Sequence, residues 1–300
     1  MSWKQISGQV SNREYASSVV FQNKLYVAMG RRSGVCLNDM YSTQDGENWV
    51  NNGPMKDSSG NAMDGRLSYG LCENNNKVYL MGGYKGVGDY LNDVYVTSDM
   101  KNWKRLQDAP WSKRYACATL SFDDKIWVLG GRDASGGLNE VWWSTDGVSW
   151  HQEPNAPWAA RRLYGGAFVY NNRLYVVGGL DDSGVPNNDV YNTFNGKSWK
   201  KVDSNYIFSA RRNIGISVID GKKIVITGGK TGSGYSNRLY HSNDGVIWGI
   251  GDTISSDKIY GHTMNYFNKK LVVVGGLNQS GANNSNVLIS EGLFGKNQRA

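Results

Sequence analysis

The sequence is poor in residues that cross-link a small fold. Its 300 residues include only three cysteines, Cys36, Cys72 and Cys117, which are too few and too far apart for a disulfide framework or a zinc cage. We expect three free thiols, which fits a reducing compartment. No apolar run approaches the roughly 18 residues of a membrane span, and the first residues lack the apolar stretch of a secretory signal. These absences favour a cytoplasmic protein, and they are also compatible with a subunit of a virion or another large assembly.

Residues that carry chemistry are equally scarce. The three histidines, His151, His241 and His262, are not spaced as metal ligands on one element, and no nucleophile motif such as G-x-S-x-G occurs. We therefore expect no metal, no cofactor and no catalytic residue, although paired carboxylates cannot be judged from sequence. The net charge of +7 is a weak pointer to anionic partners. No block of five lysines or arginines and no nucleic-acid motif is present, so we expect no nucleic-acid partner.

Glycine, by contrast, is abundant, and a Gly-Gly pair recurs at a nearly constant spacing. Each pair closes an apolar run, and in the first instance Met29 replaces the first glycine. The second glycines lie 53, 48, 48, 50 and 47 residues apart, which defines six units. The second glycines are Gly30, Gly83, Gly131, Gly179, Gly229 and Gly276, and tryptophans follow them at Trp49, Trp103, Trp150, Trp199 and Trp248.

Each unit is predicted to form a four-stranded sheet. A small, apolar strand A is joined by a short turn to strand B, which ends at the Gly-Gly pair. A Gly/Ser-rich segment, the BC loop, leads to strand C, and a tight turn, the CD turn, leads to strand D with its tryptophan. A period near 50 residues is typical of the blades of a β-propeller.

Three features resemble the kelch repeat: the Gly-Gly pair after strand B, the tyrosine that follows Asn-Asp in NDMY and NDVY, and the tryptophan on strand D. The resemblance covers nearly the whole chain. It implies an all-β fold in which residues 1–300 form one six-bladed β-propeller with four-stranded blades. It does not imply one function, because a fold of this kind hosts many.

The sixth unit lacks its own strand D. No tryptophan follows Ser285–Ser290, whereas Trp3 lies 46 residues before Trp49, which is one repeat length. We predict that residues 2–6 supply the missing strand and pair with strand C of the sixth unit, with Trp3 buried. Such closure removes the open sheet edge that the ring would otherwise expose.

Charged residues recur in register with the glycines. Five arginines lie 17 residues before a second glycine, and four acids lie 9 or 10 residues after one. Pairing within a unit would set Arg212 against Arg238, so we predict that each acid pairs with the arginine of the next unit and bridges two blades. An arginine cluster that binds an anionic ligand stays open as the alternative. The predicted pairs are Asp39–Arg66, Asp93–Arg114, Glu140–Arg162 and Asp189–Arg212.

The residue after the second glycine alternates in character. It is a cation in the odd units and apolar or aromatic in the even units, with Tyr84, Leu180 and Leu277 in the even ones. The BC loops that begin there are Gly/Ser-rich loops on a rigid ring, where binding function usually lies. Tyrosines near the start of strand A could stack on a ligand. The candidate ligand-binding residues are Arg31, Arg132, Lys230, Tyr84, Tyr15 and Tyr164.

These patterns favour a non-catalytic binding module that recognises a protein segment or a glycan, with anionic character, on the face that carries the BC loops. Two alternatives stay open. The first is a carbohydrate-active enzyme of the sialic-acid mutarotase or epimerase type, for which no acid–base pair is identifiable. The second is a structural subunit of a large assembly. The ligand and the oligomeric state are not encoded in any motif.

Overall fold

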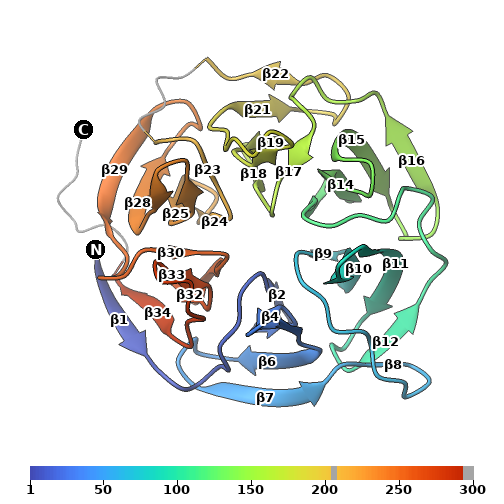
Figure 1. Cartoon of the computed structure of the whole chain (residues 1–300), viewed down its shortest axis with the longest axis horizontal. Helices are drawn as coiled ribbons and strands as arrows, with labels where there is room; N and C mark the ends of the chain where they lie inside the picture. Colours follow the sequence, from blue (N-terminus) through green and yellow to red (C-terminus); the bar gives the residue numbers. More distant parts are fainter. Residues whose placement is uncertain (204–207, 293–300) are drawn as a thin grey trace.

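The fold consists of antiparallel sheets arranged in a ring (Figure 1). A computed structural model describes residues 1–203 and 208–292. In these residues six sheets have four or more strands, and we number them 1 to 6 after the unit that supplies their first strand. None of the described residues forms a helix of the length and apolarity needed to cross a membrane.

Within each sheet the strands follow one another from the centre of the ring to its rim. Sheet 1 contains β2 (Ser17–Phe21), β3 (Lys24–Ala28), β6 (Asp39–Thr43) and β7 (Trp49–Pro54). Sheet 2 contains β9 (Gly70–Asn74), β10 (Lys77–Gly86), β11 (Asp89–Thr97) and β12 (Asn102–Arg105), with β8 (Lys56–Asp57) added in parallel at its outer edge. Sheet 3 contains β13 (Ala118–Phe122), β14 (Lys125–Arg132), β15 (Gly137–Ser144) and β16 (Trp150–Glu153).

The second half of the ring repeats this order. Sheet 4 contains β18 (Ala167–Tyr170), β19 (Arg173–Val177), β21 (Val190–Thr193) and β22 (Lys200–Lys201). Sheet 5 contains β24 (Gly215–Ile219), β25 (Lys223–Thr227), β28 (Arg238–Ser242) and β29 (Trp248–Thr253). Sheet 6 contains β31 (Thr263–Phe267), β32 (Lys270–Val274), β34 (Val287–Glu291) and β1 (Ser2–Ile6).

Short two- and three-stranded sheets form where the BC loops meet the segments that precede strand A. These are β4 (Arg31–Arg32) with β5 (Val35–Cys36), β17 (Arg161–Arg162) with β20 (Leu180–Asp181), β23 (Arg211–Arg212) with β26 (Lys230–Thr231) and β27 (Gly234–Tyr235), and β30 (Ile259–Tyr260) with β33 (Leu277–Asn278).

The two ends of the chain share sheet 6, as the sequence predicts. Strand β1 pairs antiparallel with β34, and Trp3 lies opposite Ser290. The expectation that Trp3 is buried is wrong in degree: its side chain packs on the core between sheets 5 and 6 but stays partly exposed, because β1 is the outermost strand. Closure therefore depends mainly on the β1–β34 hydrogen bonds.

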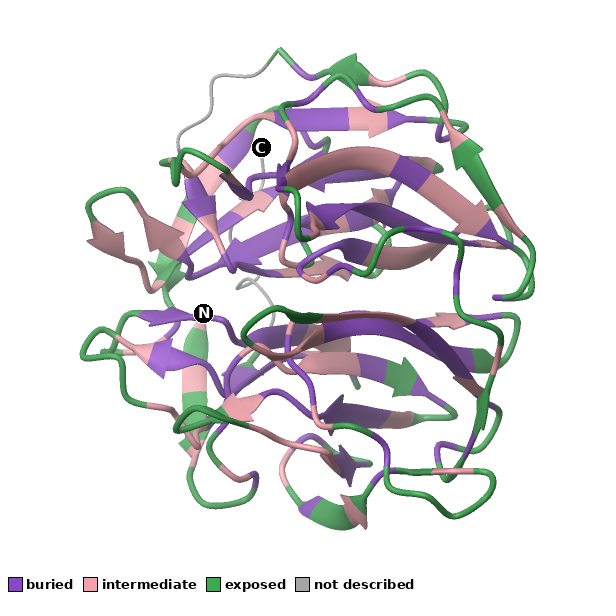
Figure 2. Ribbon diagram, turned by 45° about the vertical axis from the view of Figure 1, so that its right-hand side comes forward, coloured by how far each residue is buried: buried purple, intermediate pink, exposed green. Residues whose placement is uncertain are grey.

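Apolar side chains fill the spaces between neighbouring sheets. Each of six buried clusters combines residues from two adjacent sheets, and the inner strands are buried while the outer strands carry the exposed positions (Figure 2). The three cysteines are free thiols, and Cys72 and Cys117 are buried in the cluster between sheets 2 and 3. The apolar core of the molecule therefore lies between the sheets.

The repeated arginines are buried, but their acidic partners are not those predicted. Arg66 pairs with Asp93 at 2.6 Å, within one unit, and its side chain is completely buried. The predicted pairing of Asp93 with Arg114 is wrong, because Arg114 pairs with Glu140. The observed pairs are Arg13–Asp39, Arg66–Asp93, Arg114–Glu140 and Arg161–Asp189, in place of Asp39–Arg66, Asp93–Arg114, Glu140–Arg162 and Asp189–Arg212.

The arginines still connect neighbouring sheets, through their backbone. Arg66 accepts a hydrogen bond at its carbonyl oxygen from the Gly30 N–H of the preceding unit, at 2.9 Å. Its guanidinium donates to the Gly82 carbonyl of its own unit, at 3.0 Å. One arginine thus joins the Gly-Gly segments of two sheets, while its charge is balanced within one of them.

A one-residue shift explains two of the misassigned arginines. In the fourth and fifth units the buried arginine is Arg161 or Arg211, which lies 18 rather than 17 residues before the second glycine. Each is followed directly by a second arginine, Arg162 or Arg212, which lies at the 17-residue spacing of the other units. The like-charge contact with Arg238 that pairing within the fifth unit would create does not occur. Arg211 donates to the Tyr240 hydroxyl at 3.3 Å, and Arg238 is exposed.

Candidate functional site

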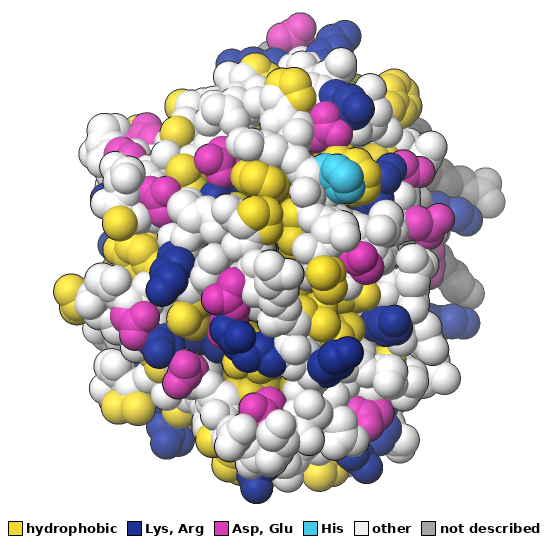
Figure 3. All heavy atoms as spheres, turned by 90° about the vertical axis from the view of Figure 1, so that its right-hand side faces the viewer, with side chains coloured by type: hydrophobic (Ala, Val, Ile, Leu, Met, Phe, Trp, Pro, Cys, Tyr) yellow, Lys and Arg dark blue, Asp and Glu magenta, His cyan; other side chains and the backbone are white. Residues whose placement is uncertain are grey.

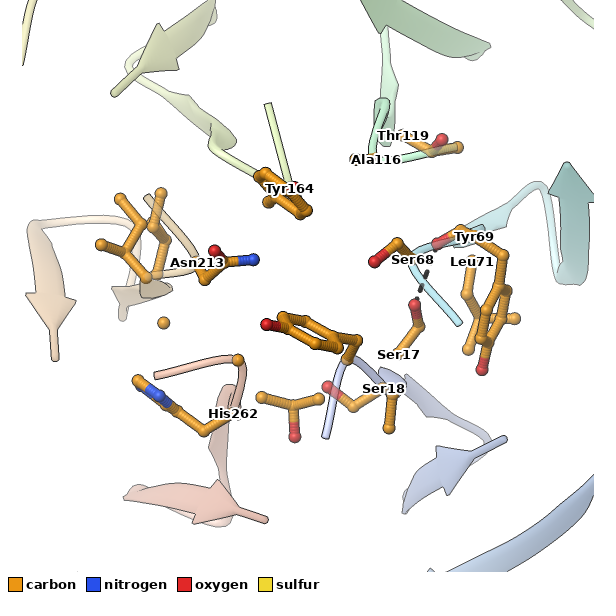
Figure 4. A pocket seen from close by; sticks show the side chains of 18 of the residues that line it. Ser17, Ser18, Ser68, Tyr69, Leu71, Ala116, Thr119, Tyr164, Asn213 and His262 are labelled. Carbon is orange, nitrogen blue, oxygen red and sulfur yellow. Dashed lines mark hydrogen bonds between the residues drawn. The ribbon is translucent and has the colours of Figure 1, made fainter. Parts of the chain in front are cut away.

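The residues just before and within each strand A surround a central cavity of about 180 Å³. Every sheet contributes to its wall, which carries hydroxyl, amide and phenol groups and, among the described residues, no carboxylate, lysine or arginine. Ser68, Tyr164 and Asn213 face the open centre in Figure 4. The cavity is thus a neutral, polar site at the meeting point of all the sheets.

The backbone around the cavity has a left-handed conformation once in every unit. Such positive φ values are uncommon for residues other than glycine and cluster at functional sites. Five of the six residues follow the buried arginine of their unit by two or three positions, and Gly261 follows Ile259, which takes the place of the arginine in the sixth unit. They are Tyr15 (φ 53°), Ser68 (51°), Ala116 (55°), Tyr164 (51°), Asn213 (54°) and Gly261 (67°).

This conformation allows the six residues to hydrogen-bond to one another around the axis. Five of the six N–H groups donate to the carbonyl of the corresponding residue in the neighbouring unit, and we call this set of bonds the girdle. Its bonds are Ser68 N to Tyr15 O (3.1 Å), Ala116 N to Ser68 O (2.7 Å), Tyr164 N to Ala116 O (2.9 Å), Gly261 N to Asn213 O (3.1 Å) and Tyr15 N to Gly261 O (2.8 Å).

The girdle is interrupted between Tyr164 and Asn213. In the described part of the chain no backbone bond joins these two residues. The Asn213 side chain is 4% exposed, and its Oδ1 atom has no hydrogen-bond partner. A buried acceptor without a partner costs free energy, on the order of 1–3 kcal/mol. Because this oxygen is itself buried, the Asn213 side chain would have to rotate toward the cavity to accept a hydrogen bond from a bound molecule.

Two predicted ligand residues meet at the mouth of this cavity. The rings of Tyr15 and Tyr164 lie 6.4 Å apart, and Tyr15 also contacts Tyr260 edge-on. Burial is the main reason that the pKa of Tyr15 is raised, and it raises the pKa of Tyr260 to about 12. Both phenols therefore stay protonated at neutral pH and can donate hydrogen bonds.

Cations stack on these rings. The Arg31 guanidinium lies 5.7 Å from the centre of the Tyr15 ring, and Arg212 lies 5.9 Å from that of Tyr164. Lys230 lies 5.3 Å from the Tyr235 ring, which stacks on Tyr260. Leaving out Arg31, which is paired with Glu14, we call the other six residues the tyrosine–cation cluster: Tyr15, Tyr164, Tyr235, Tyr260, Arg212 and Lys230.

Two of the predicted cations are already paired. Arg31 forms an ion pair with the buried Glu14 at 2.7 Å, and Arg132 forms one with Asp182. The central cavity is not lined by four of the predicted ligand residues: Arg31, Arg132, Lys230 and Tyr84. Tyr84 instead packs with Tyr90 and Tyr115 in a separate aromatic group. The six candidates therefore divide between the cavity mouth and the surrounding BC loops.

Sequence reasoning missed Asn213, Ser68 and Arg212 as site residues. Their shared signal is their place immediately after the buried arginine or two residues beyond it, which is visible once the repeats are aligned on that arginine. Arg212 was singled out, but as an ion-pair partner. Its true environment is the Tyr164 ring.

The CD turns have a structural role. In the turn after β6, the Asp45 carboxylate accepts hydrogen bonds from the backbone N–H groups of Glu47 and Asn48, both at 2.8 Å. These and other hydrogen bonds hold the pKa of Asp45 well below its usual range. Asp99, Asp146 and Asp244 repeat this arrangement. The carboxylates of these turns are therefore engaged in hydrogen bonds to the backbone of their own turn.

The described residues contain no group of three or more metal-ligating side chains. His262, the one histidine beside the cavity, is wedged against sheet 5, and burial lowers its pKa to about 4. Its Nε2 atom shares a 3.0 Å hydrogen bond with the Thr227 hydroxyl. On the side of the molecule shown in Figure 3, basic and acidic side chains are interspersed.

Comparison with known proteins agrees with the sheet repeat. The family model of the kelch motif matches residues 65–96, which span β9, β10 and most of β11. The chain therefore contains a kelch motif, and such a motif implies a β-propeller.

A distant relative supports this assignment. The chain is 28% identical over 170 residues to beta-scruin of Limulus polyphemus. The match covers 51% of this chain but only 18% of beta-scruin, so the chain corresponds to a small part of that protein.

Proposed function

We propose that the chain is a non-catalytic module that binds a protein segment at the end of the ring where the BC loops surround the central cavity. The observation that carries this proposal is the tyrosine–cation cluster at the cavity mouth, next to the unpaired Asn213 oxygen. Tyrosine and arginine are the residues most enriched in binding hot spots. The relation to beta-scruin, itself a kelch-repeat protein, favours a protein partner.

The proposal includes a single six-bladed propeller formed by residues 1–300, with sheets 1 to 6 as its blades. The repeat of one left-handed residue, one Gly-Gly segment and one sheet per unit supports this assignment. A propeller is a rigid platform, which suits binding because little conformational entropy is lost when a partner docks.

The ligand should carry an acidic group. Arg212 and Lys230 form no ion pair with any described residue, whereas Arg31 and Arg132 do. We therefore assign the attraction of an acidic segment to Arg212 and Lys230, with Arg31, Arg132 and Tyr84 at the rim of the contact. The neutral cavity beneath would accept an amide or hydroxyl side chain that donates to Asn213 Oδ1.

The test is a peptide array and a glycan array probed with the same protein. We expect a saturable peptide hit that weakens as salt rises, because exposed charges are screened beyond about 8–10 Å at physiological ionic strength. Changing both Arg212 and Lys230 to serine should weaken binding at least tenfold without changing the melting temperature by more than a few degrees. A glycan hit without a peptide hit, or turnover of a sialic acid, would overturn the proposal in favour of the alternatives.

A further inference from the structure

A second cavity, of about 300 Å³, lies between sheets 1 and 2 and away from the central axis. Its apolar wall is made by Tyr26, Met40, Met55, Met100 and Trp103. The core cluster around it holds five methionines: Met29, Met40, Met55, Met63 and Met100. Since methionine is flexible and fills irregular gaps, this interface is packed less specifically than its neighbours.

The cavity lies where unit 1 departs from the repeat. Arg66 lies 17 positions after Trp49, whereas Arg114 lies 11 positions after Trp103. The additional residues include β8, which pairs with β12 at the outer edge of sheet 2 and places Lys56 opposite Asn102 (Figure 1). Unit 1 therefore adds its own cover over the interface with sheet 2.

The same segment lacks an aromatic ring that other interfaces have. In units 2, 3 and 4 the strand-C asparagine donates to the carbonyl of Trp111, Trp158 or Phe208, whereas it donates to that of Met63 in unit 1 and to that of Ser255 in unit 5. Those rings pack edge-on against the strand-D tryptophan of the next unit: Trp111 on Trp150, Trp158 on Trp199 and Phe208 on Trp248. Trp103 has no ring contact in the described residues.

The indole N–H of Trp103 also lacks the acceptor that its equivalents use. Trp49, Trp150 and Trp199 donate to the carbonyl of the glycine in their CD turn, at 3.0, 3.2 and 3.0 Å. In sheet 2 this glycine is replaced by Met100, at φ 61°, and Trp103 Nε1 has no partner although the residue is 1% exposed. Trp248 Nε1 is unpaired too, but Trp248 has the Phe208 ring. Among the five tryptophans that follow a CD turn, only Trp103 lacks both partners in the described chain.

Three lysines give the lining of this cavity positive charge. Lys24, Lys56 and Lys101 line the cavity, and none forms an ion pair with a described residue. The one carboxylate on the lining, Asp99, accepts hydrogen bonds from the Lys101 and Asn102 backbone within its own turn. The cavity thus combines a missing ring, an unpaired N–H donor and unpaired cations.

We propose that this cavity binds a small aromatic carboxylate. Its ring would displace the flexible methionine side chains that cover Trp103 and pack there as Trp158 packs on Trp199, and its carboxylate would then accept from Trp103 Nε1 and lie near the lysines. This site shares no lining residue with the central cavity, so a test of it is independent of the proposed function.

The probe is 3-phenylpropionate, followed by NMR of protein labelled with ¹³C in its methionine methyl groups. We expect the methyl signals of Met40, Met55 and Met100 to shift, with a dissociation constant on the order of 1 mM. Met81 and Met264, which belong to other clusters, should not move. The uncharged 3-phenylpropan-1-ol should bind about tenfold more weakly, as expected for loss of a charged hydrogen-bond acceptor. Absence of these methyl shifts, or equal affinity for the alcohol, would overturn the proposal without any mutation.

A matched pair of variants tests the donor. Trp103→Phe keeps most of the side-chain volume but removes the N–H, and should weaken 3-phenylpropionate about tenfold while leaving the alcohol unchanged. Trp199→Phe removes an N–H that is already bonded to Gly196, and should leave binding at the cavity unchanged. An equal loss in both variants would show a general change of fold rather than a lost contact, and would contradict the site.

Discussion

The interface between sheets 1 and 2 and the interface between sheets 3 and 4 are built on the same repeat but filled differently. The first contains five methionines, and the second contains Trp127, Trp158 and Tyr191 with no methionine. Each region nevertheless has a buried arginine paired with an acid of its own unit, Arg66 with Asp93 and Arg161 with Asp189, both at 2.6 Å. The difference shows that the repeat fixes the backbone and the buried charges, while the space between sheets is free to vary and can become a cavity.

The largest effect should come from the buried arginine pairs, because they belong to the common framework. Arg66→Ala leaves Asp93 buried without a partner and should cost about 3–5 kcal/mol, and Arg114→Ala should cost a similar amount. A double-mutant cycle measured by chemical denaturation should show strong coupling for Arg66 with Asp93. Stronger coupling of Asp93 with Arg114 would restore pairing between units and contradict the structure.

Equivalent positions in the two interfaces should differ in cost. Trp158→Ala removes a ring that packs on Trp199 and should destabilise by about 4 kcal/mol, whereas Met63→Ala should cost about 2 kcal/mol. The flexible methionines around Met63 can move to fill the space. Equal costs, measured by the same denaturation experiment, would mean that the two interfaces are packed equally well.

The interface between sheets 5 and 6 adds a titrating group to this comparison. Because the pKa of His262 is lowered to about 4 in the folded state, the unfolded chain takes up its proton first as the pH falls below 6.5. Stability should therefore decrease between pH 6.5 and pH 4, by up to about 3 kcal/mol from this residue. His262→Gln should remove this component of the pH dependence. An unchanged pH profile in the variant would show that His262 is not the group responsible.

The smallest effect should come from the closing strand. Trp150 packs edge-on against Trp111 and donates its N–H to Gly147, whereas Trp3 has an unpaired N–H and no ring contact in the described residues. We expect Trp3→Ala to cost about 1–2 kcal/mol less than Trp150→Ala, which should cost about 3 kcal/mol. Deleting residues 1–6 should still lower the melting temperature clearly, because β34 then loses its neighbour. A deletion without effect would show that β1 does not close the ring.

The sequence predicted the framework well because its signals repeat. The Gly-Gly spacing located every strand B, and the position of Trp3 predicted the pairing of β1 with β34. The direction of the ion pairs was wrong, because spacing along the chain does not tell which of two neighbouring sheets a side chain turns toward. One extra residue in units 4 and 5 then moved the assignment from Arg161 and Arg211 to the next arginine.

The site was harder to predict for a conformational reason. The cavity depends on a left-handed backbone at Tyr15, Tyr164 and Asn213, and nothing in these residue types signals positive φ except, weakly, asparagine. Arg31 and Arg132 form ion pairs with Glu14 and Asp182, and neither acid belongs to the repeated pattern of charges in the sequence. The second cavity was visible only as the long spacing before Arg66 and as methionine at a turn position that is otherwise glycine.

The most direct test of the proposed binding face is hydrogen–deuterium exchange with the partner bound. The account predicts protection at the starts of strand A, around residues 15–18, 164–165 and 213–216, and in the BC loops, with no change at the CD turns. Protection confined to the CD turns, around residues 44–48, 98–102 and 145–149, would place the partner on the opposite face of the ring and contradict the account.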